Sequence, residues 1–78
     1  MSTADKRLQK IRSNPKTVSI DDLHALLLDY GFVCRRRKHF NYTYGRHHIA
    51  VPPNRPHVKE IYIKRILEIL AEIDEENS

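Results

Sequence analysis

The chain has 78 residues, of which 40% are apolar and 31% are charged, and its formal net charge is +4. This length allows one domain with a small core, and the composition is that of a folded chain. No apolar run reaches the roughly 20 residues of a membrane helix, and the first residues lack the apolar segment of a signal peptide. A single cysteine, Cys34, excludes an internal disulfide. We therefore expect one cytoplasmic domain over residues 1–78, ordered from about 5 to 73.

Two helices are expected before any strand. Residues 5–12 are compatible with a helix, which Asn14-Pro15 ends. Ser19 is a typical N-cap residue with an aspartate three positions later, and apolar residues then recur at helical spacing. Because Gly31 suits the position just after a helix, the second helix is expected from about 20 to 30.

After Gly31 the apolar residues recur at every second position, which predicts strands. The three strands are expected at residues 32–37, 39–44 and 47–51. Gly45-Arg46 forms a tight turn between the second and third strands, and prolines end the third strand.

A last helix is expected from about Lys59 or Glu60 to Glu72, because apolar residues form one stripe along it. Residues 74–78 are expected to fray. The predicted fold class is α+β, in the order α-α-β-β-β-α, with a three-stranded antiparallel sheet. Amphipathic helices are expected to cover one face of this sheet and leave the other in solvent.

The alternation along each strand assigns the side chains to the two faces of the sheet. The helix-covered face is predicted to hold Phe32, Cys34, Phe40, Tyr42, Tyr44, His47, Ile49 and Val51. The open face is predicted to hold Arg35, Arg37, His39, Asn41, Thr43, His48 and Ala50. A bulge near residues 36–38 would exchange the two sides of the first strand.

The middle of the chain is strongly basic. Residues 30–59 contain no Asp or Glu, yet they hold seven Lys or Arg and four of the five histidines. A surface of one charge sign attracts phosphates, so this segment predicts a polyanion-binding site. The densest cluster is Arg35-Arg36-Arg37-Lys38, whose guanidinium groups suit phosphate oxygens. The alternative interpretation is an edge strand that charge protects from aggregation.

The histidines suggest proton transfer more than metal binding. His39 follows the basic cluster, and a neutral imidazole can act as a general base. RNA carries its own nucleophile, the 2′-OH, so one base and several cations can suffice to cleave it. His47 and His48 are adjacent on a strand and point to opposite faces, so we expect no metal site and no cofactor.

The chain resembles the HicA family, the small toxins of HicA–HicB toxin–antitoxin pairs, over about residues 6–73. The resemblance rests on five segments, which are Ser13-Asn14-Pro15-Lys16, Asp22 to Phe32, Arg37-Lys38-His39-Phe40-Asn41-Tyr42, Ile49-Ala50-Val51-Pro52 and Lys59 to Leu67. It implies a fold similar to a double-stranded-RNA-binding domain, and ribosome-independent cleavage of mRNA with a histidine as the catalytic residue. From the chemistry of the 2′-OH, we expect this cleavage to need no metal. The resemblance also implies a HicB-type antitoxin as a partner.

By position, the first histidine of the family motif falls on His39, the expected catalytic residue, and a following aromatic residue falls on Tyr42. The Gly-Ser that precedes the histidine in the family is Arg37-Lys38 here, and the second histidine is Phe40. An alternative register matches the motif to Gly45-Arg46-His47-His48, but it leaves little chain before the last helix. The residues expected to contact RNA are Arg35, Arg37, Lys38, Asn41, Tyr42, Arg46, His48 and Lys59.

Two other functions are compatible with the sequence. The first is a HicA-like module that holds RNA or a partner protein without cleaving anything, which the replacement of Gly-Ser favours. The second is a chaperone-like or purely structural partner domain, which predicts no salt-dependent affinity for RNA. The two tyrosines 42 and 44 are also interpreted in two ways, because tyrosine can stack on bases whereas the alternation turns both rings towards the helices.

Overall fold

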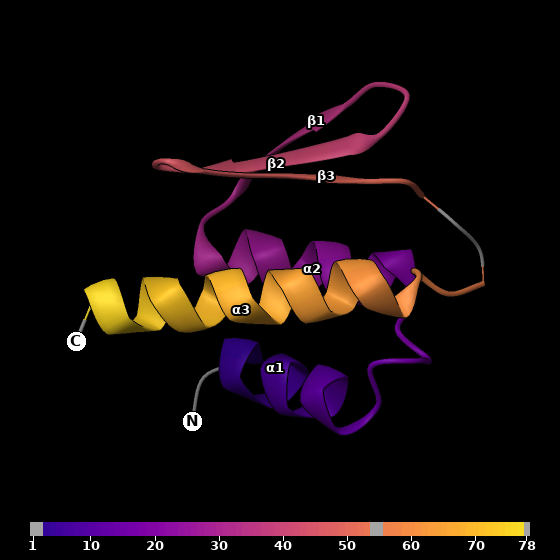
Figure 1. Ribbon diagram of the computed structural model, residues 1–78, viewed down its shortest axis with the longest axis horizontal. Helices are drawn as coiled ribbons and strands as arrows, with labels where there is room; N and C mark the ends of the chain where they lie inside the picture. Colours follow the sequence, from indigo (N-terminus) through magenta and orange to yellow (C-terminus); the bar gives the residue numbers. More distant parts are fainter. Residues whose placement is uncertain (1–2, 54–55, 78) are drawn as a thin grey trace.

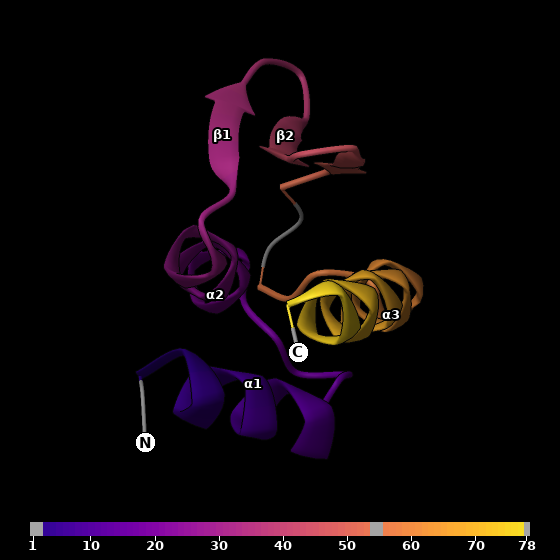
Figure 2. The same ribbon diagram turned by 90° about the vertical axis from the view of Figure 1, so that its left-hand side faces the viewer.

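The computed structural model describes residues 3–53 and 56–77, and it has the α+β order α-α-β-β-β-α that the sequence predicts. The chain forms three layers, with the sheet on one side, α2 and α3 side by side beneath it, and α1 below both helices (Figures 1 and 2). Helix α1 comprises Thr3–Ser13, α2 comprises Ile20–Tyr30 and α3 comprises Glu60–Glu76. The third layer is an arrangement that the sequence pattern did not predict.

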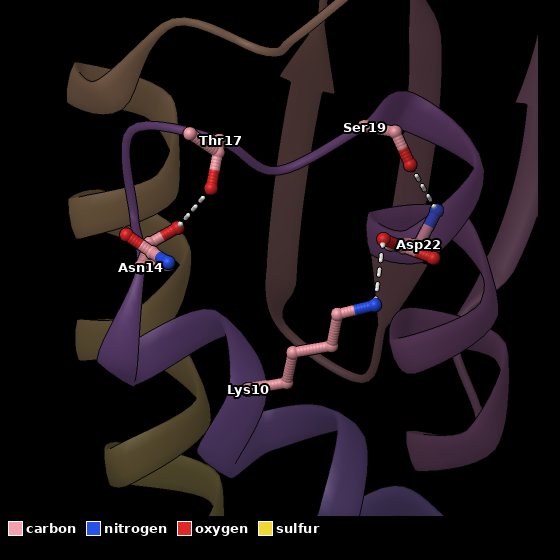
Figure 3. A network of polar contacts seen from close by, with 5 residues as sticks. All are labelled: Lys10, Asn14, Thr17, Ser19 and Asp22. Atoms are coloured by element: carbon pink, nitrogen blue, oxygen red, sulfur yellow. Dashed lines mark hydrogen bonds and ion pairs between the residues drawn. The ribbon is translucent and has the colours of Figure 1, made fainter.

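The second helix has the two ends that the sequence predicts. Ser19 accepts a hydrogen bond through its side chain from the backbone N–H of Asp22, at 3.1 Å. Gly31 follows the helix with φ of +102°, and its N–H donates to Leu28 O at 3.0 Å. The connection to α1 is also held locally, because Thr17 donates to Asn14 O and Lys10 pairs with Asp22 across the two helices (Figure 3).

Of the two glycines in the chain, Gly31 is the one with little room for a side chain. A Cβ atom there would lie 3.3 Å from the ring of Tyr44, in a backbone region that L-residues rarely adopt. We expect Gly31→Ala to lower the free energy of unfolding by about 1–2 kcal/mol, measured by urea denaturation. Gly45→Ala is the matched control, because Gly45 also has a positive φ, of +54°, but has open space around it. An equal or larger loss in Gly45→Ala would contradict the role of the Tyr44 contact.

The sheet has the strand order β1-β2-β3, with β1 at Val33–Arg36, β2 at Phe40–Tyr44 and β3 at His47–Val51. Both pairs are antiparallel and in continuous register, with Arg35 opposite Asn41 and Thr43 opposite His48. The paired residues contain no bulge, so the predicted assignment of β1 side chains to the two faces is correct. The strand β1 is shorter than predicted, because the chain turns at residues 37–39, where Arg37 N donates to His39 O.

One hydrophobic core joins the three layers. The sheet contributes Tyr42, Ile49 and Val51, and the two upper helices contribute apolar stripes. Leu8 and Ile11 of α1 are buried against the same cluster from below. The stripes comprise Ile20, Leu23, Leu26 and Leu27 of α2 and Ile63, Ile66, Leu70 and Ile73 of α3.

The last helix is longer than the sequence predicts. Fraying from residue 74 is wrong for residues 74–76, which are helical, while residue 78 lies outside the described residues. Two contacts hold this end: the Tyr30 hydroxyl donates to Asp74 at 3.1 Å, and Arg46 pairs with Glu76. Burial and the bond to Asp74 raise the pKa of Tyr30 to about 12. The end of α3 is therefore fixed by residues of α2 and of the β2–β3 turn.

A candidate polyanion-binding face on the open side of the sheet

The open face of the sheet carries a shallow groove. Alternation in the three strands points one set of side chains away from the helices, and six residues line the groove: Val33, Arg35, Arg37, Asn41, Thr43 and His48. No acidic side chain is among them. We call this set the open-face groove. Five of its six members belong to the paired strands, so rigid backbone fixes their spacing.

The groove is cationic. Among the described residues, the ion pairs involve neither Arg35 nor Arg37 nor Lys38. Both groove arginines are exposed. The third arginine of the cluster, Arg36, lies on the other side of β1, with its guanidinium 5.0 Å from the centre of the Phe40 ring. The guanidinium groups of Arg35 and Arg37 are therefore available to bind an anion. The strand β1 is also an edge strand, as the alternative interpretation of this cluster as protection against aggregation requires.

A short hydrogen-bond chain crosses the groove. The side-chain amide of Asn41 donates from Nδ2 to the backbone oxygen of His39 at 3.0 Å. Its Oδ1 lies 3.3 Å from Nε2 of His48 on the neighbouring strand. Asn41 therefore connects the β1–β2 turn to β3.

His39 lies at the edge of this site. It is exposed, in the turn just before β2, and its backbone oxygen accepts from both Arg37 N and Asn41 Nδ2. Its ring is not among the groove-lining side chains. Lys38 is exposed in the same turn. The structure thus places the expected catalytic histidine beside the groove, with its backbone tied to the groove by Asn41.

Three residues expected to contact RNA lie elsewhere. Tyr42 is fully buried beneath the sheet, Arg46 is in the β2–β3 turn beside Glu76, and Lys59 precedes the first turn of α3. None of them lines the groove. The structure corrects the expectation that Tyr42 contacts RNA, because a ring with no exposed surface cannot stack on a base. The alternation of the strand residues had already favoured a place in the core for this ring.

The hydroxyl of Tyr42 has a partner inside the molecule. It forms a 2.9 Å hydrogen bond with Nδ1 of His24 on α2, and the two rings lie 5.7 Å apart. Burial, followed by the nearby Cys34, raises the pKa of the Tyr42 hydroxyl. His24 is half-buried, and its ring is also T-shaped to that of Phe40, with the ring centres 6.2 Å apart. These contacts join the middle strand to α2, so Tyr42 stabilises the packing of the sheet on this helix.

A second polar cluster lies at the β2–β3 turn. Arg46 donates to Glu76, which is the main reason that the pKa of this carboxyl is lowered. Nε2 of the buried His47 is 3.5 Å from the same carboxylate, too long for a good hydrogen bond. Arg46 thus forms an exposed ion pair with Glu76, away from the open-face groove.

The sequence reasoning missed one lining residue, Val33. Val33 is 63% exposed and lies on the open face. The alternation that assigned Arg35 to this face would also have assigned Val33. An exposed valine beside two arginines gives the groove an apolar border on β1.

Two other kinds of site are absent from the described residues. In the ranges 3–53 and 56–77, no three His, Cys, Asp or Glu side chains are grouped so that they could hold a metal ion. No helix within these ranges is long and apolar enough to cross a membrane. Comparison with protein-family models, curated proteins and solved structures found no match.

Proposed function

We propose that this protein is an RNA-directed toxin of HicA type, which binds RNA on the open-face groove and cleaves it without a metal. The observation that carries the proposal is the groove itself, which has a histidine, no acid and two arginines that form no ion pair with another described residue. Arginine forks match phosphate oxygens and remain charged at every physiological pH. The likeness to a double-stranded-RNA-binding domain is part of this proposal and comes from the sequence resemblance.

The groove favours the RNA backbone over the bases. Proteins that read single-stranded bases present aromatic rings on an open sheet. Here the Phe and Tyr rings of β2 lie on the helix side, and the groove offers guanidinium, amide, hydroxyl and imidazole groups. We therefore infer contacts mainly to phosphate and ribose, with weak sequence preference.

The chemistry assigned to His39 is removal of the proton from a ribose 2′-OH. The 2′-oxygen then attacks the adjacent phosphorus, and Arg35 and Arg37 stabilise the charge that develops on the phosphate. His39 is exposed beside the groove, which leaves room for a ribose to reach its ring. A HicB-type antitoxin with an acidic surface would inhibit the protein by covering the same groove.

The test is incubation of the purified protein with a long single-stranded RNA in EDTA. Wild type is expected to cleave it, and His39→Ala to cleave about 10²-fold or more slowly, because positioned general bases contribute this much. His57→Ala is the control, since His57 is exposed but lies outside the groove. Full cleavage by His39→Ala would contradict the assignment of His39.

The alternative is a HicA-like module that holds RNA or a partner without cutting RNA. Arg37-Lys38 in place of the family's Gly-Ser favours it, as does the position of the His39 ring outside the lining of the groove. Intact RNA after incubation, combined with salt-dependent binding by both wild type and His39→Ala, would support this alternative.

A further inference from the structure

Cleavage of RNA by its own 2′-OH needs two proton transfers. A proton must leave the 2′-oxygen as it attacks phosphorus, and another must reach the 5′-oxygen as it departs. The function proposed above assigns only the first transfer, to His39. A second group is needed on the other side of the phosphate, within the same groove.

His48 is the imidazole that lines the groove. It is exposed on β3, opposite Thr43, and faces the same side of the sheet as Arg35 and Arg37. It lies one strand away from the turn that carries His39. A phosphate held by the two arginines would therefore lie within the surface that His48 lines.

The hydrogen bonds determine which nitrogen of His48 can exchange a proton. The backbone oxygen of His39 can only accept, so the Asn41 atom bonded to it is the donor Nδ2. The other atom of the amide, Oδ1, therefore faces Nε2 of His48 at 3.3 Å. Because Oδ1 can only accept, Nε2 must carry a hydrogen, and Nδ1 is left for proton exchange.

We propose that His48 is the general acid of the reaction and that Asn41 positions it; this inference rests on the function proposed above. The O2′–P bond forms and the P–O5′ bond breaks, while His39 takes the proton of the 2′-OH. Nδ1–H of the protonated His48 gives its proton to the departing 5′-oxygen. The products are a 2′,3′-cyclic phosphate and a 5′-OH, and solvent water restores both histidines to their starting protonation states.

The orientation of His48 does not change during this step. Nε2–H can donate to Asn41 Oδ1 whether the imidazole is neutral or protonated, so one geometry serves both states. Asn41 is itself held by the backbone of His39, the residue assigned as base. The acid and the base are thus connected through a single amide side chain.

The experiment compares two leaving groups. The cleavage position is first mapped in an ordinary RNA oligonucleotide, and a second oligonucleotide then carries sulfur in place of the bridging 5′-oxygen at that bond. A thiolate departs without being protonated, so this substrate needs no general acid. We expect His48→Ala to cleave the ordinary RNA about 10²-fold or more slowly and the thio-substituted RNA at nearly the wild-type rate. His39→Ala should lose both activities.

The remaining variants separate positioning from folding. Asn41→Ala should show a weaker form of the His48→Ala pattern, with a slower cleavage of ordinary RNA and a nearly wild-type rate on the thio-substituted RNA, because the imidazole loses the acceptor that orients it. His57→Ala should match wild type on both substrates. Cleavage rates are compared at saturating protein, so that weaker RNA binding by a variant does not affect them, and circular dichroism verifies that each variant is folded.

Three outcomes would overturn the inference. His48 is not the general acid if His48→Ala cleaves ordinary RNA at the wild-type rate, or if its cleavage rate falls equally on both substrates. In either case, cleavage by wild type still supports the proposed function. If wild type cleaves neither substrate, the proposed ribonuclease function fails and the inference fails with it.

Discussion

Reversing the charge of both groove arginines, in Arg35→Glu/Arg37→Glu, is expected to lower the affinity for RNA by about 10²-fold or more. Each charge-assisted hydrogen bond contributes about 1.5–3 kcal/mol, and the introduced carboxylates also repel phosphate. The salt dependence should weaken as well, by about one unit of the logarithmic slope for each phosphate that the protein no longer neutralises. Fluorescence anisotropy with a labelled RNA at several salt concentrations measures both quantities.

The matched control is Lys6→Glu/Arg12→Glu, which changes the net charge by the same amount. Both residues are exposed on α1, in the layer farthest from the sheet (Figure 2). If general attraction to a basic protein explained binding, the two double variants would lose equal affinity. That result would contradict the groove as the binding site, whereas a loss confined to the β1 variant would support it.

Tyr42→Ala is expected to lower the free energy of unfolding by about 3–5 kcal/mol, because removing a large buried ring leaves a cavity. Tyr42 has no exposed surface and lies between the middle strand and α2. Domains of this size are stable by about 4–12 kcal/mol in total. The variant should therefore be largely destabilised, which urea denaturation followed by circular dichroism measures.

Tyr42→Phe is the control that separates the ring from its hydroxyl. It keeps the buried ring and loses only the 2.9 Å hydrogen bond to His24, at an expected cost of about 1 kcal/mol. If Tyr42→Ala were as stable as wild type but bound RNA poorly, the residue would belong to the binding surface and not to the core. Because Tyr42 is buried in the structure, we expect Tyr42→Ala to lose stability.

The sequence was sufficient to predict the fold class and the faces to which the strand residues point, whereas His39, predicted as a strand residue of the open face, lies in the turn before β2. Ser19 and Gly31 defined α2 because capping is decided by neighbouring residues. The period of two placed Arg35, Asn41 and His48 on the open face, because strand geometry alone determines the side to which each residue points. Capping and strand alternation depend on residues a few positions apart, so the amino-acid sequence alone is enough to apply them.

The predictions that failed depend on contacts between distant parts of the chain. Residues 74–76 remain helical because Tyr30 and Arg46, far earlier in the sequence, hold their side chains. The ion pair of Arg46 with Glu76 likewise joins residues 30 positions apart. The Asn41–His48 bond joins two strands, and only the register between them shows that the side chains meet. Composition and periodicity contain no information of this kind.

The alternation of the three strands also bears on how such a protein could change over time. Each open-face position alternates with a position whose side chain faces the helices, so solvent-facing and core-forming residues are separate sets. Substitutions at Arg35, Thr43 or Ala50 can alter what the surface binds without disturbing the core below. The scaffold and its specificity can therefore evolve almost independently, and one stable framework could acquire new ligands by a few exposed substitutions.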